Sequence, residues 1–322
     1  MSINSTPLIH ILISVFEDRE SVVELLKRID ALAAAEMRFR ALLVDNGSLN
    51  APIRPEDLVD LGFESEVLTL NLNLGQQRAL AVGLAHLAER EDAEVVVVMD
   101  GDGEDRPEDI PELVAKIISG ETPITVAGRG RRQDSMVMKV LRGAYRAVFA
   151  LMTGQTLPYG NFSAISGAVL RRLVRMEELW THYPATLRCS GFPILIIPFD
   201  RGKRYAGKSR YNLVSLTVHA LRSFVPFAET LLARVLWACG IIVGLGLAAI
   251  VVGAVIKVLG YASPGWLTLV AGSVLIVVLQ VAAIALITLL LASTGQPRVT
   301  TIPATIGRSF VQKADVVPAR KR

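Results

Sequence analysis

Short apolar runs alternate with amphipathic stretches along the first 230 residues of the chain. Runs of about four to eight residues rich in Val, Ile and Leu predict buried strands, and apolar residues three and four positions apart predict helices that pack against them. The predicted strands span residues 9–16, 40–44, 67–70, 94–99 and 124–127, and the predicted helices span residues 19–35, 76–88 and 108–119.

This alternation of strands and helices predicts an α/β domain over residues 1–211, with a mostly parallel sheet and helices on both faces. Ligands of such sheets bind beyond the carboxyl ends of the strands. Polar residues follow four of the predicted strands at that edge, namely Glu17 and Asp18, Asp45 and Asn46, residues 71–75, and Asp100 and Asp102. The sequence therefore predicts a nucleotide site there.

Two later stretches carry no charge at all: residues 235–256, with 22 residues, and residues 266–292, with 27. As a helix, each would cross the roughly 30 Å hydrocarbon core of a bilayer. Buried helices of a soluble core are the alternative, but two long stretches in succession favour a transmembrane hairpin over residues 235–292. Residues 212–234 mix apolar and charged side chains, which predicts either an amphipathic helix on the membrane surface or a helix of the soluble domain.

Basic residues flank the hairpin on both sides, whereas the connection between its spans carries only Lys257. Because positive flanks stay in the cytoplasm, we expect a multi-pass protein of the cell inner membrane with both termini cytoplasmic and residues 293–322 as a basic tail. The net charge of +4 is largely this flanking, so nucleic acid is not an expected partner. Four glycines offer close-approach surfaces for a homo-oligomer of the spans: Gly240, Gly244, Gly246 and Gly253.

The composition agrees with a membrane protein of a reducing compartment. Hydrophobic residues make up 52% of the chain, and the mean hydropathy is +0.45. Two cysteines, Cys189 and Cys239, are too few for a disulfide framework. The N-terminal apolar run, residues 8–16, lacks a basic lead and continues into charged residues, so we do not expect a signal peptide.

Four carboxylates that follow the apolar run Val95–Val98 are the candidates for chemistry: Asp100, Asp102, Glu104 and Asp105. Asp100 and Asp102 can face a single divalent cation if the turn curls around it, and hard oxygen ligands suit Mg²⁺ or Mn²⁺. A metal held this way would neutralise a diphosphate leaving group. An exposed acidic loop is the alternative for Asp-x-Asp alone, but the buried strand before it favours the metal site.

Four segments in order resemble family 2 glycosyltransferases, in particular the membrane-anchored polyprenyl-phosphate glycosyltransferases related to dolichyl-phosphate mannose synthase. The resemblance covers about residues 9–211, with the hairpin following where some members carry one. The segments are LLVDNGS, NLNLGQQRALAVGL, VVVVMDGDGEDRPEDI and RYAGKSRYN. The resemblance implies a Rossmann-like nucleotide-sugar-binding domain of the glycosyltransferase A type.

The resemblance also implies roles for individual residues. The nucleotide would be contacted by Asp18, Asp45, Asn46, Gln76 and Asp100. The metal on its diphosphate would be held by Asp102 together with Asp100. The phosphate side of the donor or acceptor would be bound by Arg204, Ser209, Arg210 and Tyr211, since a basic, Gly-containing loop suits phosphate oxygens; attraction to anionic lipid is a compatible alternative. Arg131 lies in a second basic cluster that either closes over the diphosphate or is a solvated charge run.

Three positions depart from the family pattern. Asn46 stands where the family usually has a second Asp, and Asn161 and Ser163 stand where the dolichyl-phosphate branch tends to have Asp and Arg. These departures bear on the prediction of the acceptor and of the sugar more than on the prediction of the reaction type. A phosphate acceptor is largely ionised near neutral pH and needs little help from a base, whereas a hydroxyl acceptor needs one. Glu104 and Asp105 are the candidates for that base. Their alternative role is to form a solvated acidic turn that caps the next helix.

The expected function is sugar transfer from a nucleotide diphosphate sugar to a lipid phosphate such as a polyprenyl phosphate. The resemblance suggests inversion at the anomeric carbon and, from the family's bacterial members, UDP over GDP. Another acceptor, such as a lipid-linked saccharide or a diacylglycerol-type lipid, is the alternative. A non-catalytic membrane protein that binds nucleotide sugar is a rival, although the pair Asp100 and Asp102 argues against it.

Overall fold

The computed structural model describes residues 7–33, 37–129, 136–206, 213–261, 265–294 and 302–320. The chain divides into two compact units. The α/β unit consists of residues 1–147, 156–226 and 298–322, and the helical unit consists of residues 148–155 and 227–297. The α/β unit thus contains segments from both sides of the apolar hairpin.

A mixed sheet in the order β7-β5-β6-β4-β1-β2-β3-β8 forms the centre of the α/β unit. Strands β6 and β8 run antiparallel to their neighbours, and the other six strands share one direction. The predicted mostly parallel α/β sheet is therefore confirmed. The strands are β1 (Leu8–Val15), β2 (Arg38–Asp45), β3 (Glu64–Leu70), β4 (Val95–Asp100), β5 (Ile124–Arg129), β6 (Tyr159–Ser166), β7 (Ile194–Phe199) and β8 (Val311–Val317).

The register of the central strands aligns their carboxyl ends. Ser14 of β1 pairs with Asp100 of β4, and Val15 pairs with Asp45 of β2. Polar residues that follow three separate strands in the sequence are therefore neighbours at one edge of the sheet.

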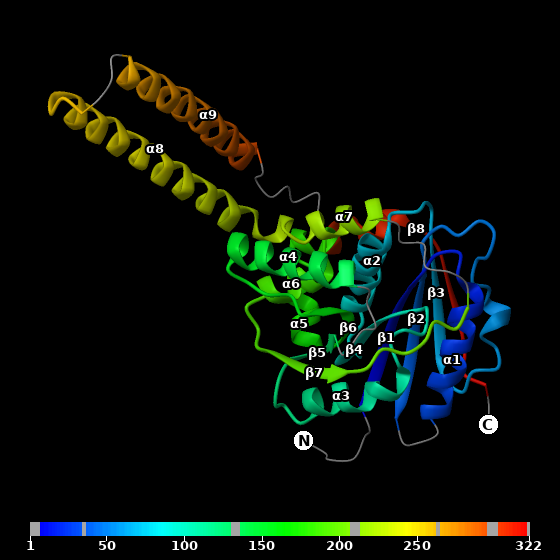
Figure 1. Ribbon diagram of the computed structural model, residues 1–322. Coiled ribbons are helices and arrows are strands. Elements are labelled where there is room, and N and C mark those ends of the chain that lie inside the picture. The colour runs from blue at the N-terminus through cyan, green and yellow to red at the C-terminus, as the bar shows by residue number, and fades with distance from the viewer. Residues whose placement is uncertain are drawn as a thin grey trace. The chain divides into compact units, whose positions relative to one another are not determined.

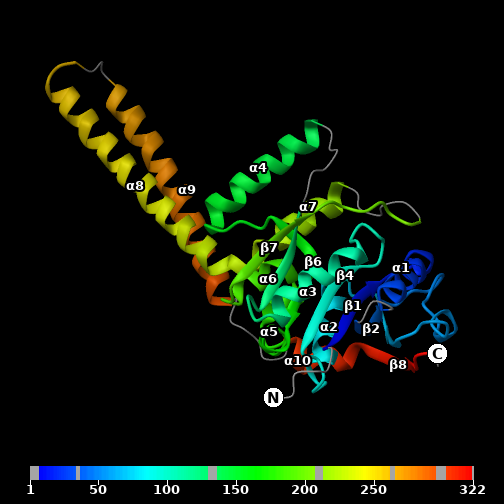
Figure 2. The same ribbon diagram turned by 90° about the horizontal axis from the view of Figure 1, so that it is seen from below.

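Helices cover both faces of the sheet (Figures 1 and 2). Successive strand residues point to opposite faces, so that Ile11 packs with α1 and α3 whereas Leu12 packs with α2, α5 and α6. Strands buried on both sides read as continuous apolar runs, which is why their sequence signal is strong. The helices are α1 (Arg19–Ala33), α2 (Gln76–Ala88), α3 (Ile110–Ile118), α5 (Gly167–Leu173) and α6 (Tyr183–Cys189).

Strands β6 and β7 were not indicated by the sequence pattern. Strand β6 lies antiparallel between β4 and β5, and its register pairs Val98 with Ser163. This insertion carries Asn161 to the carboxyl end of β4, where it reaches Asp100.

Residues 302–320 correct the expectation of a separate basic tail. Helix α10 (Pro303–Ile306) packs against α2, and β8 pairs antiparallel with β3 at the edge of the sheet (Figure 1). The ring of Phe310 packs on Trp180 with 5.6 Å between centroids. Strand β8 supplies hydrogen-bond partners to β3, which would otherwise present unpaired backbone groups as an edge strand.

The segment predicted as one amphipathic helix over residues 212–234 is divided between the two units. Helix α7 (Leu213–Arg222) belongs to the α/β unit, where the hydroxyls of Tyr145 on α4 (Met136–Thr153) and Ser223 are 2.7 Å apart. After a 3₁₀ turn at residues 225–227, helix α8 (Ala228–Val258) begins at residue 228, earlier than the predicted span start at 235.

Helices α8 and α9 (Trp266–Thr294) make up most of the helical unit. Each contains a stretch of mean hydropathy 2.7 of which only 6% is buried, so both can cross a membrane by length and composition. A core helix of a soluble protein would bury such side chains, whereas apolar residues such as Leu245 and Leu279 are exposed. The helices pack closely at Gly246, where an added Cβ would lie 3.0 Å from Val274.

Candidate active site

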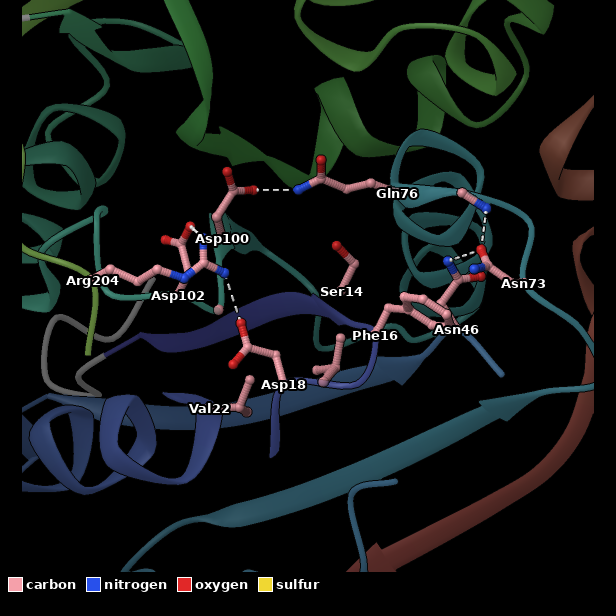
Figure 3. A pocket seen from close by; sticks show the side chains of 13 residues that line it. Ser14, Phe16, Asp18, Val22, Asn46, Asn73, Gln76, Asp100, Asp102 and Arg204 are labelled. Carbon is pink, nitrogen blue, oxygen red and sulfur yellow. Dashed lines mark hydrogen bonds and ion pairs between the residues drawn. The ribbon is translucent and has the colours of Figure 1, made fainter. Parts of the chain in front are cut away.

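A cavity of about 290 Å³ opens at the carboxyl ends of β1, β2 and β4. Figure 3 shows side chains from these strand ends and from the start of α2 around it. The cavity lies at the edge of the sheet predicted for the ligand. Six of the predicted site residues line it: Asp18, Asn46, Gln76, Asp100, Asp102 and Arg204.

Asp100, the last residue of β4, is held by amide side chains. Its Oδ1 accepts hydrogen bonds from Nε2 of Gln76 at 2.8 Å and from Nδ2 of Asn161 at 3.0 Å. Its backbone N–H donates to Oδ2 of Asp105 at 2.9 Å. Three parts of the unit, α2, β6 and the turn after β4, therefore orient this carboxylate.

Arg204 places one guanidinium between two carboxylates of the cavity (Figure 3). Its Nη2 lies 2.9 Å from Oδ2 of Asp18, and its Nη1 lies 3.3 Å from Oδ2 of Asp102. Asp18 also accepts a hydrogen bond from the hydroxyl of Ser21 at 2.7 Å. A positive charge is thus favoured where Asp18 and Asp102 approach each other.

Close packing against the turn after β4 explains how Arg204 reaches the cavity. The backbone N–H of Tyr205 donates to the carbonyl of Asp102 at 3.0 Å, and the N–H of Gly202 donates to that of Glu104 at 2.9 Å. Gly103 has a φ of +86°, and an added Cβ would lie 2.5 Å from the ring of Tyr205. A side chain at residue 103 would therefore separate the two segments.

The residues of the cavity fit a divalent cation that is completed by a bound phosphate. Asp100 and Asp102 contribute hard carboxylate oxygens to the same space, the donors that Mg²⁺ and Mn²⁺ prefer. Within the described ranges, no three His, Cys, Asp or Glu side chains are grouped as a metal site. A pair of carboxylates matches Mg²⁺ sites in which substrate phosphates and water supply the remaining ligands.

Burial raises the pKa of two carboxyl groups in the turn. It raises the pKa of Asp100, and the nearby charge of Asp102 raises it further, while the hydrogen bond from Asn161 acts in the opposite direction. Burial, together with the charge of Asp100, raises the pKa of Asp105 well above its ordinary value. A cation beside Asp100 would favour its ionised form.

The two predicted base candidates lie outside the main cavity. Glu104 pairs with Arg201, and Asp105 is buried with Oδ2 on the backbone of Asp100. Both line a smaller cavity of about 40 Å³ that also touches Asp100, together with Asp109 and Asp200. In the structure, Asp105 therefore supports the turn through the backbone of Asp100, and Glu104 forms an ion pair with Arg201.

Asp45 differs from the expectation of a nucleotide contact. It is 1% exposed and does not line the cavity. Its Oδ1 accepts the N–H of Ser48 at 2.8 Å, and its Oδ2 accepts the N–H of Ile53 at 3.0 Å. A buried carboxylate with both oxygens on backbone amides shapes the loop after β2, because its hydrogen-bonding capacity is directed to that loop.

Asn46 lines the cavity and also braces the segment before α2. Its Nδ2 donates to Oδ1 of Asn73 at 2.9 Å, and its Oδ1 accepts the N–H of Leu74 at 2.8 Å. An Asp here could accept from Leu74 but, when ionised, could not donate to Asn73. Asn46, which departs from the family pattern, therefore makes a hydrogen bond to the side-chain amide of Asn73 that an ionised Asp could not make.

Sequence reasoning placed residues 71–75 at this edge without assigning a role to Asn73, and it missed Phe16 and the position of Asn161. Phe16 is 37% exposed at the cavity, an aromatic face beside polar side chains (Figure 3). The predicted strand included Phe16 as its last residue, whereas the observed strand β1 ends at Val15 and leaves Phe16 at the edge of the sheet. No local signal places Asn161 on Asp100, because the two are 61 residues apart. The predicted site residues Arg131, Ser209, Arg210 and Tyr211 lie outside the described residues.

Residues 11–176 match the protein family described as Glycosyl transferase family 2. The chain is also 27% identical over 244 residues to undecaprenyl-phosphate 4-deoxy-4-formamido-L-arabinose transferase of Klebsiella pneumoniae, covering 74% of this chain and 72% of that relative. The relative of Erwinia tasmaniensis with the same description is 26% identical over 252 residues, covering 76% of this chain and 75% of the relative.

A solved structure with a similar fold is glucosyl-3-phosphoglycerate synthase from Mycobacterium tuberculosis in complex with Mn²⁺, UDP and glucosyl-3-phosphoglycerate. It has a TM-score of 0.51 and 15% identity, and the match covers 70% of this chain and 80% of that chain. The complex of the same enzyme with Mg²⁺ and UDP has a TM-score of 0.50 and 14% identity, covering 70% and 79%.

Proposed function

The chain belongs to glycosyl transferase family 2 and is a glycosyltransferase, and from this premise we propose that it transfers a sugar from a nucleotide diphosphate sugar to a polyprenyl phosphate at a membrane. The observation that carries the proposal is the cavity at the strand ends, where Asp100 and Asp102 face the same space beside Arg204. The acceptor is inferred from the relatives of Klebsiella and Erwinia, which are undecaprenyl-phosphate transferases.

The proposal includes a divalent cation, Mg²⁺ or Mn²⁺, held by Asp100 and Asp102. Support comes from the carboxylate donors of the cavity and from the Mycobacterium structures, which contain Mn²⁺ or Mg²⁺ with UDP. When bound, the cation would neutralise the negative charge of the diphosphate leaving group. The UDP in the same structures is the support for proposing UDP over GDP as the nucleotide.

The chain's own residues would bind and orient the reactants. Asp18, Asn46 and Gln76 line the cavity and would contact the nucleoside, and Phe16 offers a face on which a base could stack. Arg204 suits the oxygens of a diphosphate. We propose that Ser209, Arg210, Tyr211 and Arg131 act on the phosphate side.

A phosphate acceptor explains why a strong base is dispensable. Its oxygen is largely ionised near neutral pH, since the second pKa of a phosphate monoester is about 6. In the proposed step, an oxygen of the acceptor phosphate forms a bond to the anomeric carbon of the sugar and inverts its configuration. The bond between that carbon and the diphosphate oxygen breaks, and the nucleoside diphosphate leaves. Glu104 or Asp105 would take a proton only if the acceptor is a hydroxyl.

Helices α8 and α9 are proposed to span the cell inner membrane, with residues 1–211, the juxtamembrane segment 212–234 and the C-terminal segment on the cytoplasmic side. The long apolar stretch in each helix, of which only 6% is buried, and the basic flanks support this arrangement. Association of hairpins from two copies is also proposed, because an added Cβ at Gly240 or Gly244 meets no described atom within 4 Å.

The test offers a panel of radiolabelled UDP- and GDP-sugars to the purified full-length protein in detergent, with undecaprenyl phosphate and Mn²⁺. We expect label from one sugar to enter the organic phase. Asp102→Asn, which keeps the side-chain shape but removes the charge, should reduce transfer at least about 100-fold.

The other outcomes separate the alternatives. Donor hydrolysis without labelled lipid would contradict the polyprenyl phosphate acceptor and direct the search to a lipid-linked saccharide or another lipid. No turnover of any donor by the wild type would favour a non-catalytic nucleotide-sugar-binding protein. Equal transfer by wild type and Asp102→Asn would contradict the proposed metal site.

A further inference from the structure

A series of hydrogen bonds through two amide side chains, buried Gln77 and half-buried Asn161, ends at Asp100. The backbone N–H of Tyr183, at the start of α6, donates to Oε1 of Gln77 at 2.6 Å. Nε2 of Gln77 donates to Oδ1 of Asn161 at 3.3 Å, and Nδ2 of Asn161 donates to Oδ1 of Asp100 at 3.0 Å. We call this series the amide relay; it connects α6, α2, β6 and β4.

The relay has a direction that its far end imposes. A backbone N–H can only donate, so Gln77 must turn its oxygen toward α6 and its NH₂ group toward Asn161. Asn161 must then turn its oxygen toward Gln77 and its NH₂ group toward Asp100. The orientation of the Asn161 amide is therefore determined by a helix start that does not touch the cavity.

The relay and Gln76 act on the same atom of Asp100. Oδ1 accepts from both Gln76 and Asn161, whereas Oδ2 accepts no hydrogen bond from any residue within the described ranges. Two donors on one oxygen restrict rotation of the carboxylate and leave the other oxygen available. Gln77 is 5% exposed, so its hydrogen bonds are sheltered from competing water, whereas Asn161 is half-buried and lines the smaller cavity.

We propose that Asn161 and Gln77 are positioning residues that orient Asp100 toward the divalent cation of the glycosyl transfer. This inference rests on the proposed function. It also gives a physical reason for Asn at residue 161: an ionised Asp could not donate to Asp100 and would bring a second negative charge within hydrogen-bonding distance of it.

The test measures Mn²⁺ binding without any sugar donor, by electron paramagnetic resonance of free Mn²⁺ added to the full-length protein in detergent. Asn161→Ala removes the donor to Asp100. Gln77→Glu keeps the acceptor for Tyr183 but cannot donate, so the Asn161 amide should turn its oxygen toward Asp100. Each variant should raise the Kd about 10- to 100-fold, as other partners of metal ligands do.

A double variant distinguishes positioning from a merely structural role. Because Gln77 acts through Asn161, the double variant Asn161→Ala, Gln77→Glu should bind Mn²⁺ no more weakly than Asn161→Ala alone. Multiplied effects would overturn the relay. If Gln77→Glu does not fold, Gln77→Met replaces it in the same cycle.

Tyr159→Phe is the matched control, since Tyr159 lies two residues from Asn161 on β6. Its buried hydroxyl has no hydrogen-bond partner among the described residues, so the Kd should not change. An unchanged Kd in Asn161→Ala would overturn the relay while leaving the metal site in place. Absent binding in the wild type, or equal binding by Asp100→Asn, would instead overturn the metal site of the proposed function, and the relay with it.

Discussion

At the scale of single residues, Arg204 is expected to affect the binding of both the divalent cation and the diphosphate of the sugar donor. Its guanidinium is shared by Asp18 and Asp102, so it would compete with the proposed cation for the carboxylate of Asp102. The same guanidinium is suited to the oxygens of a diphosphate. Removal of its charge should therefore affect the metal and the donor in opposite directions.

Arg204→Gln is expected to bind Mn²⁺ about two- to fivefold more tightly in the absence of a donor, the equivalent of a partly exposed ion pair of up to about 1 kcal/mol. Affinity for the nucleotide diphosphate should fall about tenfold, since a hydrogen bond to a charged group is lost. Titration calorimetry with Mn²⁺ and then with the nucleotide measures both effects.

Lys203→Gln is the control, because it removes the same charge from the neighbouring, exposed position. It should leave both affinities nearly unchanged. Weaker Mn²⁺ binding in Arg204→Gln would contradict the competition between Arg204 and the cation.

At the scale of elements, strand β8 makes the sheet depend on residues that follow the hairpin. Its pairing with β3 spans Ser65 to Leu70 on one strand and Val311 to Val317 on the other. The two faces of β8 differ sharply, since Val317 is 6% exposed and Val316 is 58% exposed. Burial of Val317 against the α1 side of the sheet ties the C-terminal segment to the core.

Val317→Asn should lower the free energy of unfolding of the α/β unit by about 2 kcal/mol, because a polar group is buried without a designed partner. Val316→Asn, the same change on the adjacent and exposed position, should alter it by less than about 0.5 kcal/mol. Thermal unfolding of both variants in detergent measures the difference. Equal destabilisation would indicate that β8 is not packed on the sheet as described.

At the scale of the whole molecule, the chain leaves the α/β unit after residue 226 and returns to it at residue 298. Two spans that begin and end in one folded unit must return to the side of the membrane from which they started. The connection near Tyr261 should therefore lie on the opposite side. This constraint is independent of the basic flanks from which the same topology was predicted.

Single cysteines test the topology in intact cells. In a background of Cys189→Ser and Cys239→Ala, Tyr261→Cys should react with a membrane-impermeant maleimide, because Tyr261 is 83% exposed. Lys313→Cys on β8 should react only after the membrane is opened. Labelling of Lys313→Cys in intact cells would contradict the return of the chain to the α/β unit on the cytoplasmic side.

Features that depend on local pattern could be predicted from the amino-acid sequence alone. Continuous apolar runs identified five strands of the sheet, since a strand buried on both faces needs them. Charge-free stretches identified both apolar helices, and the Asp-x-Asp after a buried strand identified Asp100 and Asp102 at the cavity. These signals are local, because burial and turn geometry act on neighbouring residues.

Features that join distant segments of the chain became visible in the folded structure and could not be predicted from local pattern. Nothing near residue 161 indicates that its amide holds Asp100, and nothing near residue 311 indicates that β8 completes a sheet begun before the hairpin. Asp45 shows the same limit, since its carboxylate serves the loop after β2 instead of the cavity. The physical reason is that a buried polar group takes whatever partner the packed chain brings to it, and that partner is set by topology, not by local sequence.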